Sequence, residues 1–170
     1  MAAWLEVRQV RQSVIIGNSL GAQVLADLAA RYHQCLSAAV MAAPTFDPGA
    51  RSVTAQLFRL LRDLPREPAS LYPIGFSDYL KAGWVTILET LLHALAHPID
   101  ATLRSIRAPV LLISGERDPI MPQAWRAEAA RLIPLVKPVV LRGVAHALPF
   151  SAPGVLVEEV LTFLKSTGDL

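Results

Sequence analysis

Short apolar runs alternate with segments of helical periodicity along most of this chain. Four runs are each closed by a nearby glycine or proline, and they occupy residues 14–16, 38–42, 110–113 and 139–141. Apolar side chains recur at helical spacing over 20–32, 122–133 and 156–164. Strands that alternate with helices in this way are typical of βα units around a parallel sheet. The pattern predicts an α/β fold with a parallel sheet of about four strands and flanking helices.

Residues 45–107 interrupt this alternation and contain no convincing strand pattern. They carry two apolar helical stripes, the first formed by Val53, Leu57, Leu60 and Leu61 and the second by Val85, Leu88, Leu91, Leu92 and Leu95. Prolines within 64–68, followed by Pro73 and Gly75, separate the two stripes. We therefore expect a helical cap over 45–107, inserted within a single domain of residues 1–170.

Composition narrows the class of protein. A chain of 170 residues suits one domain with a real core, and 53% hydrophobic with 18% charged residues excludes a disordered chain. Arginines are scattered rather than clustered, so no nucleic-acid partner is expected. No apolar run approaches membrane-spanning length and the N-terminus lacks a signal-peptide pattern, so we expect a soluble cytoplasmic protein without a membrane partner. The single cysteine, Cys35, has no partner for a disulfide or a zinc site.

The segment Gly17-Asn18-Ser19-Leu20-Gly21 carries the main chemical signal. It follows an apolar run and precedes a helical stripe, which is the context of the G-x-S-x-G nucleophile elbow. A serine on so sharp a turn needs small neighbours, which accounts for a glycine two positions away on each side. The alternative is a glycine-rich turn between a strand and a helix of any α/β protein.

Two further polar residues follow strands at the same predicted edge of the sheet. Asp118 comes shortly after 110–113, and His146 comes shortly after 139–141. The carboxyl ends of parallel strands are where α/β folds build their sites. The chain order serine, aspartate, histidine is that of the hydrolase triad. Taken singly, Asp118 is also explained as a helix-capping residue and His146 as a loop residue.

Other candidates carry weaker signals. Asp47, just after the second strand, is an alternative to Asp118 as the acid. His93 and His97 lie four residues apart on a predicted helix, but no third ligand accompanies them, so we expect no metal and no cofactor. Arg66 and Tyr79 of the cap are within conceivable reach of a substrate, although nothing in the sequence selects them.

The chain resembles the α/β-hydrolase superfamily, in the branch that carries a helical cap after the sixth strand. The markers are Gly17-Asn18-Ser19-Leu20-Gly21, Gly115-Glu116-Arg117-Asp118-Pro119 and Gly143-Val144-Ala145-His146. The resemblance equates 13–43 with strands five and six, 45–107 with the cap and 108–170 with strands seven and eight. A serine at position 19 argues against branches that use a carboxylate nucleophile.

The expected mechanism follows from these residues. Ser19 would be the nucleophile and His146 the general base, while Asp118 would hold the imidazole in its productive tautomer. The backbone N–H of Leu20 would supply one oxyanion-hole donor. A complete member of the superfamily has about 80–100 further residues before the elbow. Their absence here leaves three explanations open, namely a misassigned start, a truncated product, or a fragment completed by another chain.

Three functions remain as hypotheses. The first is hydrolysis of a small carboxylic ester through an acyl-enzyme intermediate. The second is carbon–carbon bond hydrolysis, because elbows that read Gly-Asn-Ser-Leu-Gly resemble those of such enzymes. The third is a truncated, catalytically impaired remnant. Strand 14–16 would form an exposed apolar edge, so we also expect self-association and activity barely above background for the chain alone.

Overall fold

The computed structural model describes residues 1–169 and is built on a parallel sheet of four strands. The strands are β1 (Ser13–Asn18), β2 (Leu36–Ala42), β3 (Val110–Gly115) and β4 (Val136–Leu141). They lie in the order β1-β2-β3-β4, and every neighbouring pair is parallel. The predicted sheet and its strand order are therefore confirmed.

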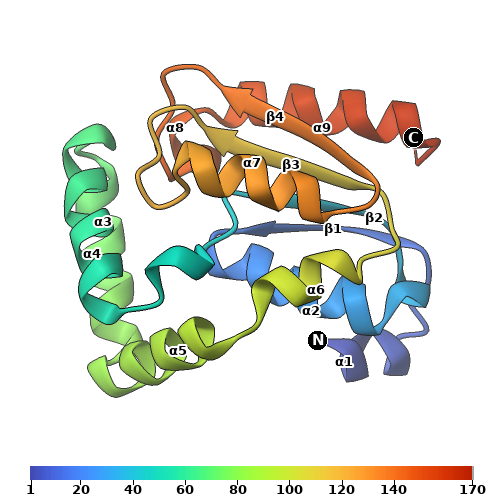
Figure 1. The fold of residues 1–170 in the computed structure, drawn as a ribbon, viewed down its shortest axis with the longest axis horizontal. Helices are drawn as coiled ribbons and strands as arrows, with labels where there is room; N and C mark the ends of the chain where they lie inside the picture. Colours follow the sequence, from blue (N-terminus) through green and yellow to red (C-terminus); the bar gives the residue numbers. More distant parts are fainter. Residues whose placement is uncertain (170) are drawn as a thin grey trace.

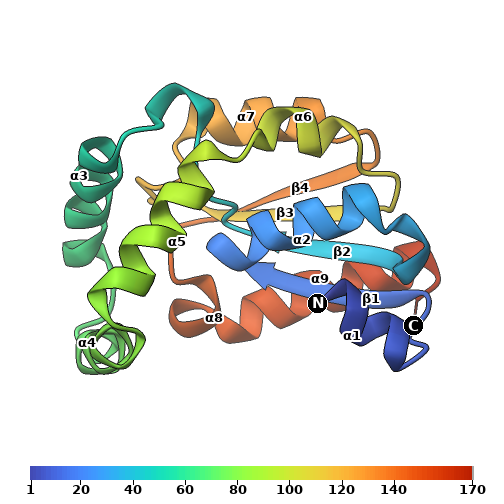
Figure 2. The same cartoon turned by 90° about the horizontal axis from the view of Figure 1, so that it is seen from below.

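Helices cover both faces of this sheet (Figures 1 and 2). The helices of the described chain are α1 (Ala2–Val7), α2 (Leu20–Arg31), α3 (Val53–Asp63), α4 (Leu71–Ala82), α5 (Trp84–Ala96), α6 (Ile99–Arg104), α7 (Gln123–Leu132), α8 (Leu148–Ser151) and α9 (Pro153–Thr167). Figure 2 shows α2, α6 and α7 on one face, with α8 and α9 on the other. Short 3₁₀ turns occupy His33–Cys35, Pro48–Ala50 and Leu64–Arg66.

Strand β2 shows how the two cores are divided. Its side chains alternate between the faces of the sheet, as the period of a strand requires. Ala39 and Met41 pack into a core with α2, α6 and α7, whereas Ala38 and Val40 pack into a second core with α8 and α9. A strand buried on both faces reads as a continuous apolar run, which explains why 38–42 lacks an alternating pattern.

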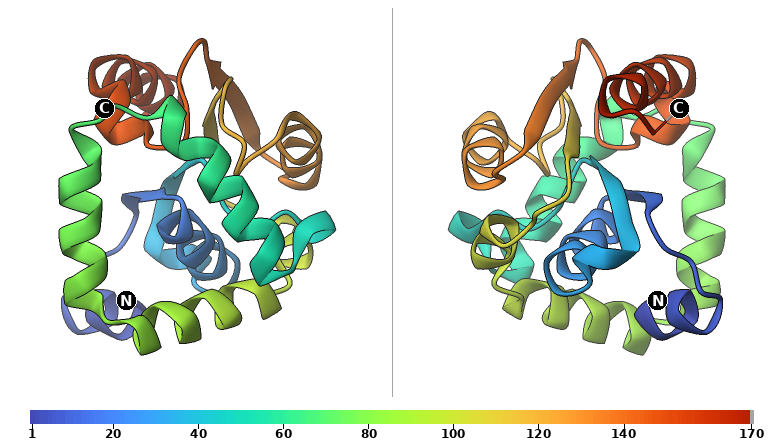
Figure 3. Two further views of the ribbon diagram at one scale, coloured as in Figure 1. Left: turned by 90° about the vertical axis from the view of Figure 1, so that its left-hand side faces the viewer. Right: turned by 90° about the vertical axis from the view of Figure 1, so that its right-hand side faces the viewer.

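The segment expected to form the cap contains α3, α4, α5 and α6. Figure 1 shows α3, α4 and α5 beyond the carboxyl ends of the strands, and Figure 3 (left) shows them running in three different directions. Helix α5 contacts both α3 and α4. Helix α6 instead packs with α2 and α7, and its Ile99 and Leu103 are fully buried in the first core.

Helix α4 is absent from the sequence-based prediction, because Pro73 and Gly75 are typical of breaks between helices. Pro73 lies in the first turn, where the missing N–H has no intrahelical acceptor to lose. Gly75 lies in the interior and costs the helix about 1 kcal/mol relative to alanine. The predicted stripes do form α3 and α5, but most of their large apolar side chains remain exposed. Periodicity therefore predicted the helices and not what covers them.

The two edge strands, β1 and β4, are both longer than expected. Strand β4 begins at Val136 and includes Pro138, which an edge strand tolerates because its outer side needs no N–H donor. Strand β1 is the other edge, and its Ile16 side chain is 57% exposed. The expected self-association through this edge stays a prediction. No helix within residues 1–169 is long and apolar enough to cross a membrane.

The burial of α6 can be tested by truncating one of its side chains. Leu103→Ala should lower the free energy of unfolding by about 2–5 kcal/mol, because it opens a cavity in a packed core. Leu88→Ala on α5 is the matched control, since Leu88 is 51% exposed and its loss should change stability by about 0.5 kcal/mol or less. Urea denaturation of both variants measures the difference. Equal, small losses would mean that α6 does not belong to the core.

Candidate active site

Ser19 occupies the sharp turn between β1 and α2. Its backbone lies at φ +55° and ψ −120°, a conformation that non-glycine residues rarely adopt. Its N–H donates to the Ala42 carbonyl at 2.8 Å, which ties the turn to the end of β2. Because the surrounding backbone holds this strained turn, the hydroxyl is presented at the carboxyl edge of the sheet.

The two glycines of the elbow differ in whether a side chain would fit in their place. A Cβ at Gly17 would meet the Gly21 carbonyl oxygen at 2.5 Å, so only glycine fits there. A Cβ at Gly21 would meet nothing within 4 Å among the described residues. The expectation that both positions exclude side chains is therefore wrong for Gly21. The backbone of Gly21 occupies the space where a side chain of residue 17 would lie.

Three predicted residues converge at this edge from three separate elements. His146 Nε2 lies 2.8 Å from Ser19 Oγ, and His146 Nδ1 lies 2.8 Å from Asp118 Oδ2. Both distances are within hydrogen-bonding range. The imidazole thus bridges the hydroxyl and the carboxylate, as the sequence predicted. Its side chain is 12% exposed, and that of Asp118 is fully buried.

The Asp118 carboxylate is fixed by its other oxygen. Oδ1 accepts from the backbone N–H groups of Ile120 at 2.7 Å and Met121 at 3.0 Å. These two bonds satisfy one oxygen and leave Oδ2 for the imidazole. Charge-assisted bonds of this kind are stronger than neutral ones, so the carboxylate is oriented before any substrate binds.

The loops after β3 and β4 cross one another, and this crossing sets the distance between Asp118 and His146. A Cβ at Gly115 would collide with the Ala145 carbonyl oxygen, so the second loop passes directly over this glycine. Arg117 donates its N–H to the Val144 carbonyl at 2.9 Å. Glu116 accepts from the Gly143 N–H at 2.9 Å. Gly115 and Gly143 are therefore structural parts of the motifs that carry the acid and the histidine.

Electrostatics at His146 favour the protonated form. Burial lowers its pKa, but the hydrogen bond and charge of Asp118 outweigh this effect, with added contributions from Asp63 and Glu67. The net result is a pKa above the usual value of 6.5. An imidazole with raised basicity next to a serine hydroxyl is suited to accept its proton.

Leu20, expected to supply an oxyanion donor, is the first residue of α2. Backbone N–H groups in the first turn of a helix lack intrahelical acceptors, and the positive end of the helix dipole lies there. The position therefore suits a donor to a developing oxyanion. Its catalytic role stays a prediction.

The alternative candidates have other partners. Asp47 forms an ion pair with Arg59 at 2.6 Å and also accepts from the Gly49 N–H. His97 lies 3.4 Å from an Asp27 oxygen, on α2. Within residues 1–169, no group of three or more His, Cys, Asp or Glu side chains is placed to hold a metal ion.

Two acidic residues near His146 escaped the sequence analysis. Asp63 ends α3 and Glu67 follows the 3₁₀ turn after it, and both are buried. Their spacing in the sequence matches no motif. Only the folding of the cap segment against the loop after β4 brings them to the histidine.

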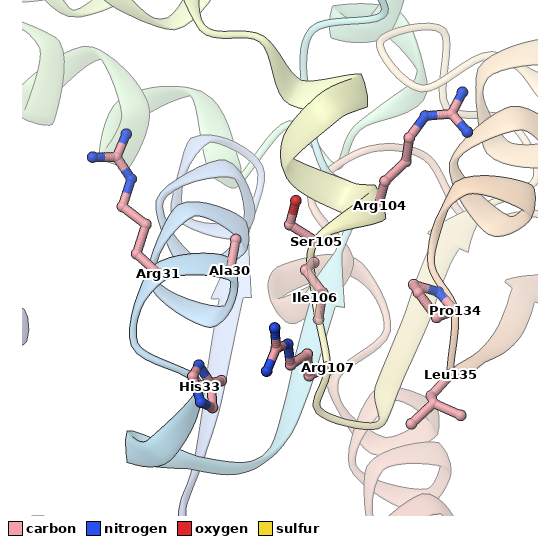
Figure 4. Close-up of a pocket in the computed structure, with 9 residues that line it drawn as sticks. All are labelled: Ala30, Arg31, His33, Arg104, Ser105, Ile106, Arg107, Pro134 and Leu135. Atoms are coloured by element: carbon pink, nitrogen blue, oxygen red, sulfur yellow. The ribbon is translucent and has the colours of Figure 1, made fainter.

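A cavity of about 610 Å³ lies at the amino ends of β3 and β4, away from Ser19 (Figure 4). Its lining is Ala30, Arg31, His33, Arg104, Ser105, Ile106, Arg107, Pro134 and Leu135. Figure 4 shows Arg31 and Arg104 extending in diverging directions. Arg31 is also paired with Asp27 at 2.8 Å. The cavity is therefore separate from the candidate active site.

The different roles of the elbow glycines can be tested with two variants. Gly17→Ala should lower the free energy of unfolding by about 1–3 kcal/mol, because its methyl group collides with backbone. Gly21→Ala should leave stability unchanged or raise it by up to about 1 kcal/mol, since it lies in a helix and meets no neighbour. Thermal and urea denaturation give both values. A Gly21→Ala variant as unstable as Gly17→Ala would contradict this account of the elbow.

Several solved structures share this fold. A putative non-heme bromoperoxidase, BpoC, from Mycobacterium tuberculosis H37Rv matches with a TM-score of 0.70 and 21% identity, over 98% of this chain and 71% of that one. An E-2-(acetamidomethylene)succinate hydrolase matches with a TM-score of 0.74 and 20% identity, over 96% of this chain and 70% of that one. Esterase RhEst1 from Rhodococcus sp. ECU1013 matches with a TM-score of 0.65 and 25% identity, over 98% of this chain and 70% of that one.

This chain spans only part of these proteins. In two of the similar structures it corresponds to 56% and 71% of the other chain. The family model described as the alpha/beta hydrolase family matches residues 2–159, which include the elbow, Asp118 and His146. The chain belongs to the α/β-hydrolase family.

Proposed function

We propose that this chain is a serine hydrolase that cleaves small carboxylic esters through an acyl-enzyme intermediate. The observation that carries the proposal is the unbroken hydrogen-bonded series from Ser19 through His146 to Asp118, with both links at 2.8 Å. A serine in a strained turn, a base within reach of its proton and an orienting carboxylate together meet the geometric requirements of nucleophilic catalysis.

The proposed reaction has two halves. Ser19 Oγ attacks the ester carbonyl while His146 Nε2 takes the hydroxyl proton, and the imidazolium then gives that proton to the departing alcohol. Water, deprotonated by His146, attacks the acyl-enzyme, and the proton returns to Ser19 as the acid leaves. Asp118 keeps Nδ1 protonated, so that Nε2 is the free base.

The Leu20 N–H is proposed to stabilise the oxyanion of each tetrahedral intermediate. Its place at the start of α2, directly after the nucleophile, supports this role. One such donor is worth about 3–4 kcal/mol of transition-state stabilisation. No metal takes part in this scheme, because the histidine activates the serine.

An ester is proposed as the substrate because one similar structure, at 25% identity, is an esterase. Carbon–carbon bond hydrolysis is the second candidate, because the elbow Gly-Asn-Ser-Leu-Gly resembles those of enzymes that catalyse it. A panel that offers short-chain esters beside a vinylogous 1,5-diketone acid separates the two chemistries. Turnover confined to the diketone acid would replace the ester proposal with the second candidate.

Reaction with a fluorophosphonate tests the nucleophile directly, because the probe phosphonylates an activated serine. The chain should gain one label, located at Ser19 by peptide mass spectrometry, and Ser19→Ala should gain none. His146→Ala should react at least about 100-fold more slowly, because the general base is lost. Ser105→Ala, at the other end of the sheet, is the control and should react at the parent rate. Labelling that persists in Ser19→Ala would reject the proposal.

The pH dependence of this labelling follows from the pKa of His146. Only the neutral imidazole accepts the serine proton, so the rate should rise with pH through a midpoint above the usual 6.5. Asp118→Asn should move that midpoint to lower pH, since Asp118 stabilises the imidazolium, and should lower the plateau rate by up to about 10⁴-fold. A stopped-flow profile from pH 5 to pH 9 measures both. A midpoint below 6.5 in the parent chain would contradict the electrostatic description.

A further inference from the structure

The loop that carries His146 is held from the cap side by one carboxylate. Glu67 Oε1 accepts the backbone N–H of Ala147 at 2.6 Å, and Oε2 accepts the Ser151 hydroxyl at 2.6 Å. Ala147 is the residue next to His146, and Ser151 ends α8. Both oxygens of Glu67 are therefore committed to the segment immediately after the histidine. Glu67 itself is 8% exposed, so these bonds form away from bulk water.

A second carboxylate reaches the histidine from the same side and lacks a matching set of partners. Asp63 is 5% exposed, and its Oδ1 atom is buried without a hydrogen-bond partner. Burial raises the pKa of Asp63 to about 6, while the positive charge and the backbone N–H of His146 oppose this rise. The charges of Glu67 and Asp118 add to the rise.

Three carboxylates therefore lie around the imidazole of His146. Asp118 touches Nδ1 from the β3 side of the sheet, and Asp63 and Glu67 approach from the cap. All three charges stabilise the protonated form of His146. Only Asp118 forms a hydrogen bond with the His146 ring, whereas Asp63 and Glu67 act on it through their charge over a longer distance.

The energetics of Asp63 argue against a purely structural role. An ionised carboxylate buried without full hydrogen bonding lowers the stability of the fold. The folded protein holds the Asp63 proton more tightly than the unfolded chain does, so stability falls as pH rises from about 4 to about 6. A neutral side chain of the same shape would avoid this cost. The charge is instead kept beside the group that becomes cationic in the proposed reaction.

We propose that Asp63 and Glu67 are positioning residues through which the cap acts on His146, Glu67 by holding its loop and Asp63 by stabilising the imidazolium with its charge. The inference rests on the proposed function for its catalytic meaning. It depends on contacts of the described residues and not on the identity of the substrate. The cap is thereby assigned a part in the chemistry.

Titration of the His146 imidazole by NMR tests this without any turnover. In the full chain, Asp63→Asn and Glu67→Gln should each lower the pKa of His146 by about half a unit to one unit, because each removes a negative charge nearby. Asp78→Asn removes an exposed carboxylate of α4 and serves as the control, with no change expected. Values for both cap variants that equal the control would overturn the proposal.

Thermal denaturation adds a readout that separates the charge of Asp63 from a packing role. Asp63→Asn should be more stable than the parent at pH 7.5, with the difference shrinking toward pH 4, where Asp63 is protonated in the parent. A residue that only packs would lose stability on substitution at both pH values. A stabilised variant with a lowered His146 pKa supports the proposal, and a destabilised variant with an unchanged pKa rejects it.

A separate variant tests whether Glu67 holds the loop, and it stays informative if Glu67→Gln does not fold. Ser151→Ala removes one of the two bonds and leaves the charge in place. Hydrogen exchange at the Ala147 amide should become faster, while the pKa of His146 should change less than in Asp63→Asn. Unchanged exchange at Ala147 would remove Glu67 from the proposal. Should Ser19 fail to react with a fluorophosphonate while these shifts appear, the proposed function fails and the effect of the cap on His146 stands.

Discussion

The crossing of two loops at Gly115 is the constraint on which the candidate site depends. The carbonyl groups of Val144 and Ala145 occupy the space where a side chain at this position would lie. With glycine there, the loop after β4 closes onto the loop after β3, and the backbone bond from Arg117 to Val144 locks the contact. The parallel sheet brings the strand ends to one edge, but this contact brings the imidazole of His146 within 2.8 Å of Asp118. The strained turn at Ser19 supplies the third partner from β1.

The cap lies at the same edge of the sheet. Its residues Asp63 and Glu67 add negative charge near His146 to that of Asp118. The Asp118 carboxylate accepts hydrogen bonds from two backbone donors, and Glu67 accepts from one backbone donor and one hydroxyl. Asp63 is the exception, because one of its oxygens has no partner. A site that keeps a poorly satisfied charge beside a histidine gives up stability locally, as functional sites commonly do.

Local sequence predicted the parts of this molecule that are determined locally. Ser19, Asp118 and His146 each follow an apolar strand in a short loop, so strand context and chain order were enough to bring them to one edge. Local rules failed where position within an element decides the outcome. Pro73 fits because it lies in a first helical turn, and Pro138 because β4 is an edge. Asp63 and Glu67 gave no signal, because their meaning comes from contacts about 80 residues away along the chain.

A crystal structure of the chain after reaction with an organophosphonate ester would show directly whether Ser19 is the nucleophile. We expect continuous density between phosphorus and Ser19 Oγ, with a phosphonyl oxygen on the Leu20 N–H. His146 Nε2 should face the leaving-group side while Nδ1 keeps its bond to Asp118. Phosphonylation at another side chain, or an imidazole turned away from both Ser19 and Asp118, would contradict the assignment of this site.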